Sequence, residues 1–301
     1  MKTYRLSLIT FFMFLIEPAV FAKLTVVAST SDLGALATEV AGDAATVDTI
    51  AKGTQDPHFI EAKPSFMVKL SRADLLISTG LELEVGWLPN IVQGARNPRV
   101  QPGARGYLEL GPLIEPLEVA KGHLTRADGD VHPEGNPHFT LDPIRTGTAA
   151  ILIANRLGEL DAAHAAASLT RAQAIKDRLE KKTKLWKDRL GRTGIKEVVT
   201  YHKTLTYFLD RFDIKNPAIL EPKPGIPPTA KHTLEVIALL REKKIPLILV
   251  ENYFDSAVAD RITKDVPGTR TRTVAVAVEG DPSIRGIDDL YESLVRSFES
   301  N

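Results

Sequence analysis

The stretch LTVVASTSDLGALATEVAGDAATVDTIA, residues 24–51, reads as a strand, an amphipathic helix and a second strand. Residues 64–80, PSFMVKLSRADLLISTG, continue with another helix and another strand. Short runs of β-branched and aliphatic residues that alternate with helical periodicity are typical of βαβ units. Such units form a mainly parallel sheet with helices on its faces, so the sequence predicts an α/β fold.

A second series of alternating segments follows later in the chain. Its expected strands are residues 197–201, 246–250 and 273–278, and its expected helices are residues 205–212, 233–244, 256–265 and 287–298. A stretch of strong helix formers lies between the two series. It begins with Asp142, a good capping residue, followed by Pro143 in the first helical turn. We therefore expect two α/β lobes and a helical region with a long connecting helix. Their expected bounds are residues 23–142, 143–194 and 195–301.

The first residues have the pattern of a targeting segment. Lys2 and Arg5 precede the apolar run LSLITFFMFLI, and the segment ends in AVFA. This pattern predicts a secretory signal peptide over residues 1–22 that is removed after Ala22, with an uncleaved anchor as the alternative. The chain has no cysteine, so we expect neither disulfides nor a lipid anchor on cysteine. We expect a protein located in the periplasm.

Composition narrows the range of partners. The 38 basic and 38 acidic residues balance, whereas a nucleic-acid-binding protein carries a strongly basic surface. No later segment approaches the run of about 20 apolar residues that a membrane helix needs. We therefore expect a soluble monomer that binds small or specific partners and no nucleic acid.

One segment has neither helical nor strand periodicity. Residues 115–137, EPLEVAKGHLTRADGDVHPEGNP, are rich in glycine, proline, histidine and aspartate, which predicts a mobile loop within the first lobe. The loop carries His123 and His132. Two interpretations are open, and in the less favoured one these two imidazoles capture metal ions weakly and pass them to a neighbouring site. The alternative is a solvated insertion whose histidines have no role.

Other histidines, and one aspartate, follow expected strands or precede an expected helix. His58 and His202 each follow a strand, His138 lies just before the helical region, and Asp281 follows the last strand. Ligands bind beyond the carboxyl ends of parallel strands, so these four side chains, two from each lobe, suit a metal site in a cleft between the lobes. Three imidazoles and a carboxylate are good zinc ligands. The alternative is that each histidine only forms structural hydrogen bonds and that Asp281 begins a turn.

Five segments in order resemble a known family. They are GTQDPHFIEAKPSFMVKLSRADLLISTGLELE (53–84), NPHFTLDP (136–143), TYHKTLTYFLDRF (200–212), PLILVENYFDSAVADRI (246–262) and VEGDPS (278–283). After a signal peptide, this series resembles the zinc and manganese solute-binding proteins of bacterial ABC importers, the ZnuA and TroA type of cluster A-I. The resemblance implies two α/β lobes joined by a long rigid helix. It also implies that His58, His138, His202 and Asp281 hold the metal in the cleft.

The resemblance further implies a receptor and not an enzyme. Such a receptor captures Zn²⁺ in the periplasm and delivers it to an ABC permease in the inner membrane, with a periplasmic zinc chaperone as a further partner. An imidazole at His202 favours zinc, whereas a carboxylate there would suit manganese, so a manganese receptor is an alternative. Glu251 follows a strand and is the alternative fourth ligand. A periplasmic zinc hydrolase and a receptor for an organic solute are the other functions that the residues leave open.

Overall fold

The computed structural model describes residues 23–120, 122, 129 and 132–299. The expected signal peptide lies outside these residues. The strands are β1 (Leu24–Ala28), β2 (Ala45–Thr49), β3 (Leu75–Ser78), β4 (Tyr107–Glu109), β5 (Val199–Thr200), β6 (Leu247–Glu251) and β7 (Arg270–Val274). The α-helices are α1 (Ser31–Ala41), α2 (Pro64–Ser71), α3 (Leu88–Ala95), α4 (Pro143–Leu160), α5 (Ala165–Thr193), α6 (Thr206–Arg211), α7 (Ala230–Lys243), α8 (Ala257–Asp265) and α9 (Ile287–Phe298).

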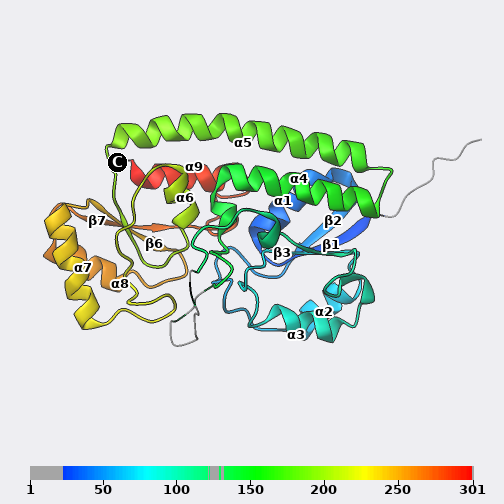
Figure 1. Cartoon of the computed structure of the whole chain (residues 1–301), viewed down its shortest axis with the longest axis horizontal. Helices are drawn as coiled ribbons and strands as arrows, with labels where there is room; N and C mark the ends of the chain where they lie inside the picture. The colour runs from blue at the N-terminus through cyan, green and yellow to red at the C-terminus, as the bar shows by residue number, and fades with distance from the viewer. Residues whose placement is uncertain (1–22, 121, 123–128, 130–131, 300–301) are drawn as a thin grey trace, which may run out of the picture.

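Two parallel sheets form the centres of two lobes, as Figure 1 shows. The first sheet has the strand order β2-β1-β3-β4, and the second has the order β5-β6-β7. Every strand pair in the described residues is parallel; Val27, for example, lies opposite Asp48 on one side and Leu76 on the other. The predicted α/β fold with two lobes is therefore confirmed.

Alternation along the strands explains why both faces of each sheet are covered. In β1, Val26 and Ala28 pack into one core, whereas Val27 packs into another with residues of α2 and α3. In β6, Leu249 faces the first core and Val250 faces a third, which contains residues of α7 and α8. Successive strand side chains point to opposite faces, so each sheet needs helices on both sides.

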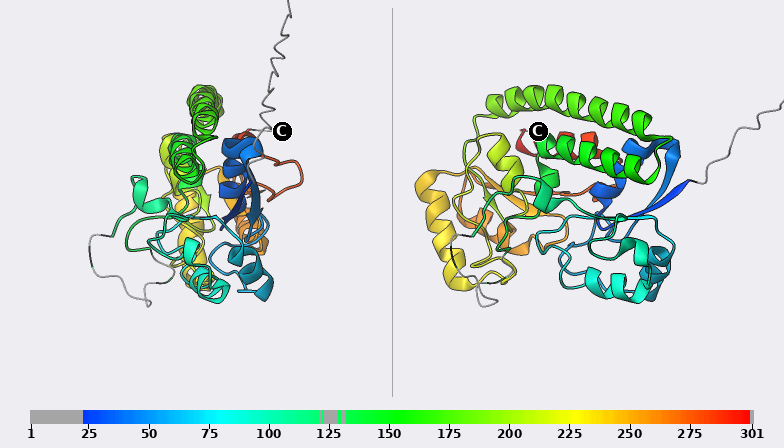
Figure 2. Two further views of the ribbon diagram at one scale, coloured as in Figure 1. Left: turned by 90° about the vertical axis from the view of Figure 1, so that its right-hand side faces the viewer. Right: turned by 45° about the vertical axis from the view of Figure 1, so that its right-hand side comes forward.

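The helical region between the lobes is an α4–α5 hairpin. Helix α5 has 29 residues, about 43 Å at 1.5 Å per residue, and it runs over both lobes with α4 and α9 beneath it (Figures 1 and 2). One hydrophobic core extends from the first sheet through α4, α5 and α9 to the second sheet. The long connecting helix that we expected thus also seals a core common to both lobes.

The expected strand over residues 273–278 differs from the structure. Strand β7 begins earlier and ends at Val274, because the next amide groups bind side chains in place of a neighbouring strand. The amide of Val276 donates to Asn252 Oδ1 at 3.4 Å, and the amide of Val278 donates to Asp32 Oδ1 at 2.7 Å. These bonds lead the chain from β7 towards the start of α1 in the other lobe. Among the described residues, no helix has the length and apolarity required to cross a bilayer.

Candidate metal centre

Three histidines from distant parts of the chain meet between the lobes. His58 lies between β2 and α2, His138 directly precedes the short 3₁₀ helix η5 (Phe139–Leu141), and His202 follows β5. Their potential ligand atoms lie within 4.8 Å of one another. All three residues are buried, with 7%, 7% and 4% of their surface exposed. The structure therefore brings together three of the four residues that we expected at a metal site.

Two of the imidazoles are oriented by carboxylates. His58 Nδ1 lies 2.7 Å from Asp56 Oδ1, and His202 Nδ1 lies 2.6 Å from Glu221 Oε2. A carboxylate accepts the Nδ1–H proton, which leaves the lone pair of a neutral ring on Nε2. Histidines that bind metals almost always have such a partner on their other nitrogen. The pairing therefore leaves His58 and His202 each with Nε2 as the nitrogen able to bind a metal.

His138 is prepared for a cation in another way. Its Nε2 is buried and has no hydrogen-bond partner among the described residues. Burial, together with the neighbouring imidazoles of His58, His202 and His132, lowers the pKa of His138 well below its usual value. The ring is therefore neutral at pH 7. A buried lone pair without a partner costs free energy unless a donor or a cation satisfies it.

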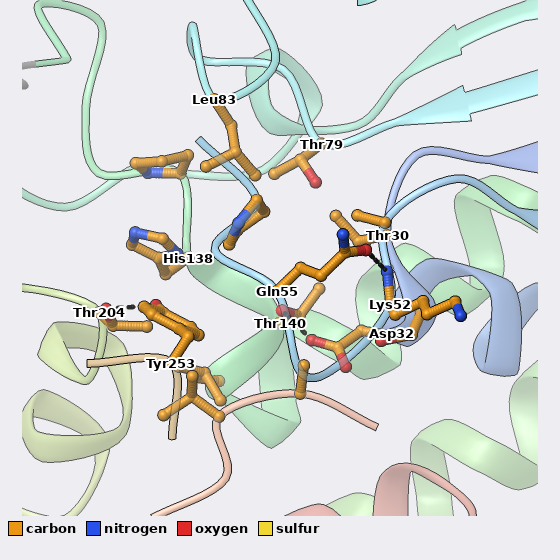
Figure 3. Close-up of a pocket in the computed structure, with 17 residues that line it drawn as sticks. Thr30, Asp32, Lys52, Gln55, Thr79, Leu83, His138, Thr140, Thr204 and Tyr253 are labelled. Carbon is orange, nitrogen blue, oxygen red and sulfur yellow. Dashed lines mark hydrogen bonds between the residues drawn. The ribbon is translucent and has the colours of Figure 1, made fainter. Parts of the chain in front are cut away.

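The cavity beside His138 is small. It lies between the lobes, and Figure 3 shows His138 on its wall with Thr79 and Leu83 from the first lobe and Thr204 and Tyr253 from the second. Its volume of about 40 Å³ holds on the order of three water molecules. An organic solute needs several hundred Å³, so the space suits an ion.

Asp281 does not join the three histidines in the structure. It is exposed, and its Oδ1 accepts hydrogen bonds from the backbone amide of Ser283 at 2.9 Å and from the Ser283 hydroxyl at 2.6 Å. Strand β7 ends early, and the chain then crosses to α1 before Asp281 opens this turn. The position that we expected at the carboxyl end of a strand is thus the start of an exposed turn.

Glu251, the alternative fourth ligand, lies behind the site. It is fully buried at the end of β6, and its Oε1 accepts the backbone amide of His202 at 3.3 Å. Burial raises the pKa of Glu251 to about 8, so the group is mostly a neutral acid at pH 7. A neutral carboxyl group that supports the backbone of His202 is a weak metal ligand.

The histidines of the 115–137 segment are placed differently. His123 lies outside the described residues. His132 lies against the site, with its Nε2 3.3 Å from His58 Nε2.

Two further histidines lie away from the site. His164 pairs with Asp161 at the start of α5, and His232 Nε2 lies 2.9 Å from the carbonyl oxygen of Ile219.

The two carboxylates that orient the imidazoles, Asp56 and Glu221, were not among the residues predicted for the site. Asp56 had a local signal, because its side chain can reach back to the amide and ring of a histidine two residues later, as it does here. Glu221 had none: it lies 19 residues beyond His202 in an irregular segment.

Comparison with known proteins decides the family. Residues 26–298 match the family described as "Zinc-uptake complex component A periplasmic", ZnuA. The chain belongs to the ZnuA family. The resemblance that the sequence suggested is therefore confirmed over nearly the whole described chain.

The relatives of this ZnuA family member are named for different metals. The chain is 27% identical over 251 residues to the "Iron-binding protein YfeA" of Yersinia pestis, which covers 81% of this chain and 74% of that protein. It is 26% identical over 252 residues to the "Manganese ABC transporter substrate-binding lipoprotein scaA" of Streptococcus gordonii. This match covers 81% of this chain and 77% of that protein. A crystal structure of ZnuA superposes with a TM-score of 0.75 at 20% identity over 92% of this chain and all of the other, which shows the same fold.

Proposed function

We propose that this protein is a zinc receptor: it binds one Zn²⁺ in the cleft through His58, His138 and His202 and supplies it to an ABC importer. The observation that carries the proposal is the convergence of three buried imidazoles whose ligand atoms lie within 4.8 Å of one another. Zinc accepts nitrogen donors in a tetrahedral arrangement at about 2.0–2.1 Å. The match to the ZnuA family over residues 26–298 supports the same function.

The donor atoms favour zinc over manganese. Imidazole nitrogen suits zinc, whereas manganese prefers carboxylate, carbonyl and water oxygens. The nearby carboxylates of Asp56 and Glu221 bind Nδ1 atoms and so act behind the imidazoles. Relatives named for iron and for manganese are both similar to this chain over 81% of its length, so we base the choice of metal on the ligand atoms and not on the fold.

A receptor also fits the cleft better than a hydrolase or an organic-solute receptor. A zinc hydrolase needs an open metal position, a general base and a substrate pocket. Here the two adjacent carboxylates are engaged with imidazoles, and the cavity of about 40 Å³ has room for an ion and a few waters.

The cell location and partner follow from the receptor role. We infer that the mature protein works in the periplasm and docks on an ABC permease in the inner membrane, and that a zinc chaperone supplies it there. Because the core under α5 is common to both lobes, release of the ion requires loop or small lobe movements and not a wide hinge opening.

Titration of the purified protein with zinc and manganese tests this proposal. We expect one zinc per chain, and a gain in unfolding free energy of about 4 kcal/mol when free zinc is 1,000 times its Kd. Manganese should stabilise the protein less at the same concentration. A protein that binds no zinc, or binds manganese more tightly, would contradict the proposal, and zinc-dependent hydrolysis of ester or peptide substrates would favour the enzyme.

Replacing Glu221 by alanine should weaken zinc binding by about 10–100-fold, the range for partners that orient metal-binding histidines. Without this carboxylate, His202 loses the acceptor that holds its Nδ1–H and fixes its ring. Glu235→Ala is the matched control, because Glu235 faces His232 Nδ1 at 3.4 Å on the exposed surface of α7. Competition with a zinc-binding dye gives both affinities. Equal affinities would show that Glu221 does not support the site.

A further inference from the structure

A fourth imidazole, that of His132, lies beside His58 at the edge of the three-histidine cluster. His132 Nε2 lies 3.3 Å from His58 Nε2, and the ring centroids are 5.4 Å apart. For comparison, the centroids of His58 and His138 are 5.1 Å apart, and those of His58 and His202 are 5.5 Å apart. His132 thus approaches His58 as closely as the proposed ligands do.

The distance between the Nε2 atoms of His58 and His132 matches the distance between two nitrogen ligands of one zinc ion. For Zn–N bonds of about 2.0–2.1 Å, two nitrogens at neighbouring corners of a tetrahedron lie about 3.3–3.4 Å apart. When the His58 ring is neutral and its Nδ1–H donates to Asp56, its Nε2 is an acceptor, and the contact with His132 then has His132 Nε2–H as the donor. A cation that replaces this proton would contact both nitrogens.

The backbone around His132 is held in place by its neighbours. The amide of Ala120 donates to the carbonyl of Pro133 at 3.1 Å, and the amide of Gly135 donates to the carbonyl of His132 at 3.1 Å. The side chain of Asn136 donates to Glu118 Oε2 and to the carbonyl of Lys203, each at 3.1 Å. These bonds tie the end of the segment to the second lobe, one residue after His202.

We propose that His132 is the fourth ligand of the metal ion, in the place expected of Asp281, and that the resulting four-imidazole shell selects zinc over manganese. This inference rests on the proposed function. It changes the role of His132 from a capture group outside the site to a member of the site. A shell without oxygen donors binds zinc well and lacks the carboxylates that manganese prefers.

Paired variants of the full mature chain test the assignment. His132→Ala should lower zinc affinity at least about tenfold while manganese affinity changes less than about threefold, and Asp281→Ala should change neither. His132→Asp should restore a fourth ligand but lower the ratio of zinc to manganese affinity, which a merely structural role of His132 would not do. Cobalt(II) should give the strong visible absorption of a tetrahedral site in the wild type and a changed spectrum in His132→Ala.

The outcomes separate this inference from the receptor function. If the wild type binds zinc, His138→Ala does not, and His132→Ala keeps both the affinity and the cobalt spectrum of the wild type, the receptor function stands and the fourth-ligand assignment is wrong. A loss of affinity in Asp281→Ala but not in His132→Ala would return the fourth position to Asp281. A wild type that binds no zinc would overturn both proposals. Equal melting temperatures of the metal-free variants would show that each is folded.

Discussion

Replacing His138 by alanine is expected to weaken zinc binding by more than about 100-fold, beyond the range for residues that only orient a ligand. The imidazole of His138 is buried, and its Nε2 has no hydrogen-bond partner among the described residues. Burial is the main reason why the pKa of His138 is lowered, and the neighbouring imidazoles lower it further. Its removal takes away a neutral nitrogen donor that no nearby side chain replaces in this position. Competition titration with a chelator of known affinity measures the effect.

His164→Ala is the control for this result. His164 is a partly exposed histidine whose Nδ1 lies 2.6 Å from Asp161 Oδ2 at the start of α5. We expect zinc affinity in this variant to equal that of the wild type. A similar loss in both variants would mean that zinc binds histidines generally and that the cluster in the cleft is not a specific site.

Replacing Asp32 by asparagine should remove a pH dependence of stability worth about 3 kcal/mol. Asp32 is buried at the start of α1 and accepts hydrogen bonds from Thr140 Oγ1 at 2.9 Å and from the amide of Val278 at 2.7 Å. Burial raises its pKa from 3.8 to about 6, and the two hydrogen bonds only partly oppose this shift. The raised value means that the folded protein holds this proton more tightly than the unfolded chain.

The sign follows from proton binding. The contribution of the protonated Asp32 is complete below about pH 3 and is lost as the pH rises through about 6, above which the folded protein must bury a carboxylate. The unfolding free energy of the wild type minus that of Asp32→Asn should therefore fall by about 2.5 kcal/mol between pH 4 and pH 7. Urea unfolding of the metal-free proteins measures this difference. The matched difference for Asp43→Asn, an exposed aspartate, should stay within about 0.5 kcal/mol, and a flat curve for Asp32→Asn would show that Asp32 is ionised without cost.

The fold could be predicted because its signals are local. Apolar runs alternate with helical periodicity in residues 24–51 and again in residues 233–265, and this alternation predicts parallel strands. His58 and His202 could be placed for the same reason, since each follows a strand of its own lobe and ligands bind beyond the carboxyl ends of parallel strands. The sequence did not reveal the common core under α5, because that core depends on the packing of distant segments.

The remainder of the site depends on contacts between residues far apart in the chain. The alternation of residues 273–278 predicts a strand, but Asn252 and Asp32 bind the amides of Val276 and Val278 and direct the chain away from the sheet. Asp281 is exposed as a result. The pairing of Glu221 with His202 and the approach of His132 to His58 are likewise tertiary contacts for which the sequence carries no periodic signal.

A crystal structure of the protein with zinc, with anomalous data collected on both sides of the zinc absorption edge, tests the central claim most directly. We expect one strong anomalous peak between the lobes, about 2.0–2.2 Å from the Nε2 atoms of His58, His138 and His202. Zinc bound only at the surface, or a peak that these three nitrogens do not surround, would contradict the claim that the cleft is a zinc-binding site.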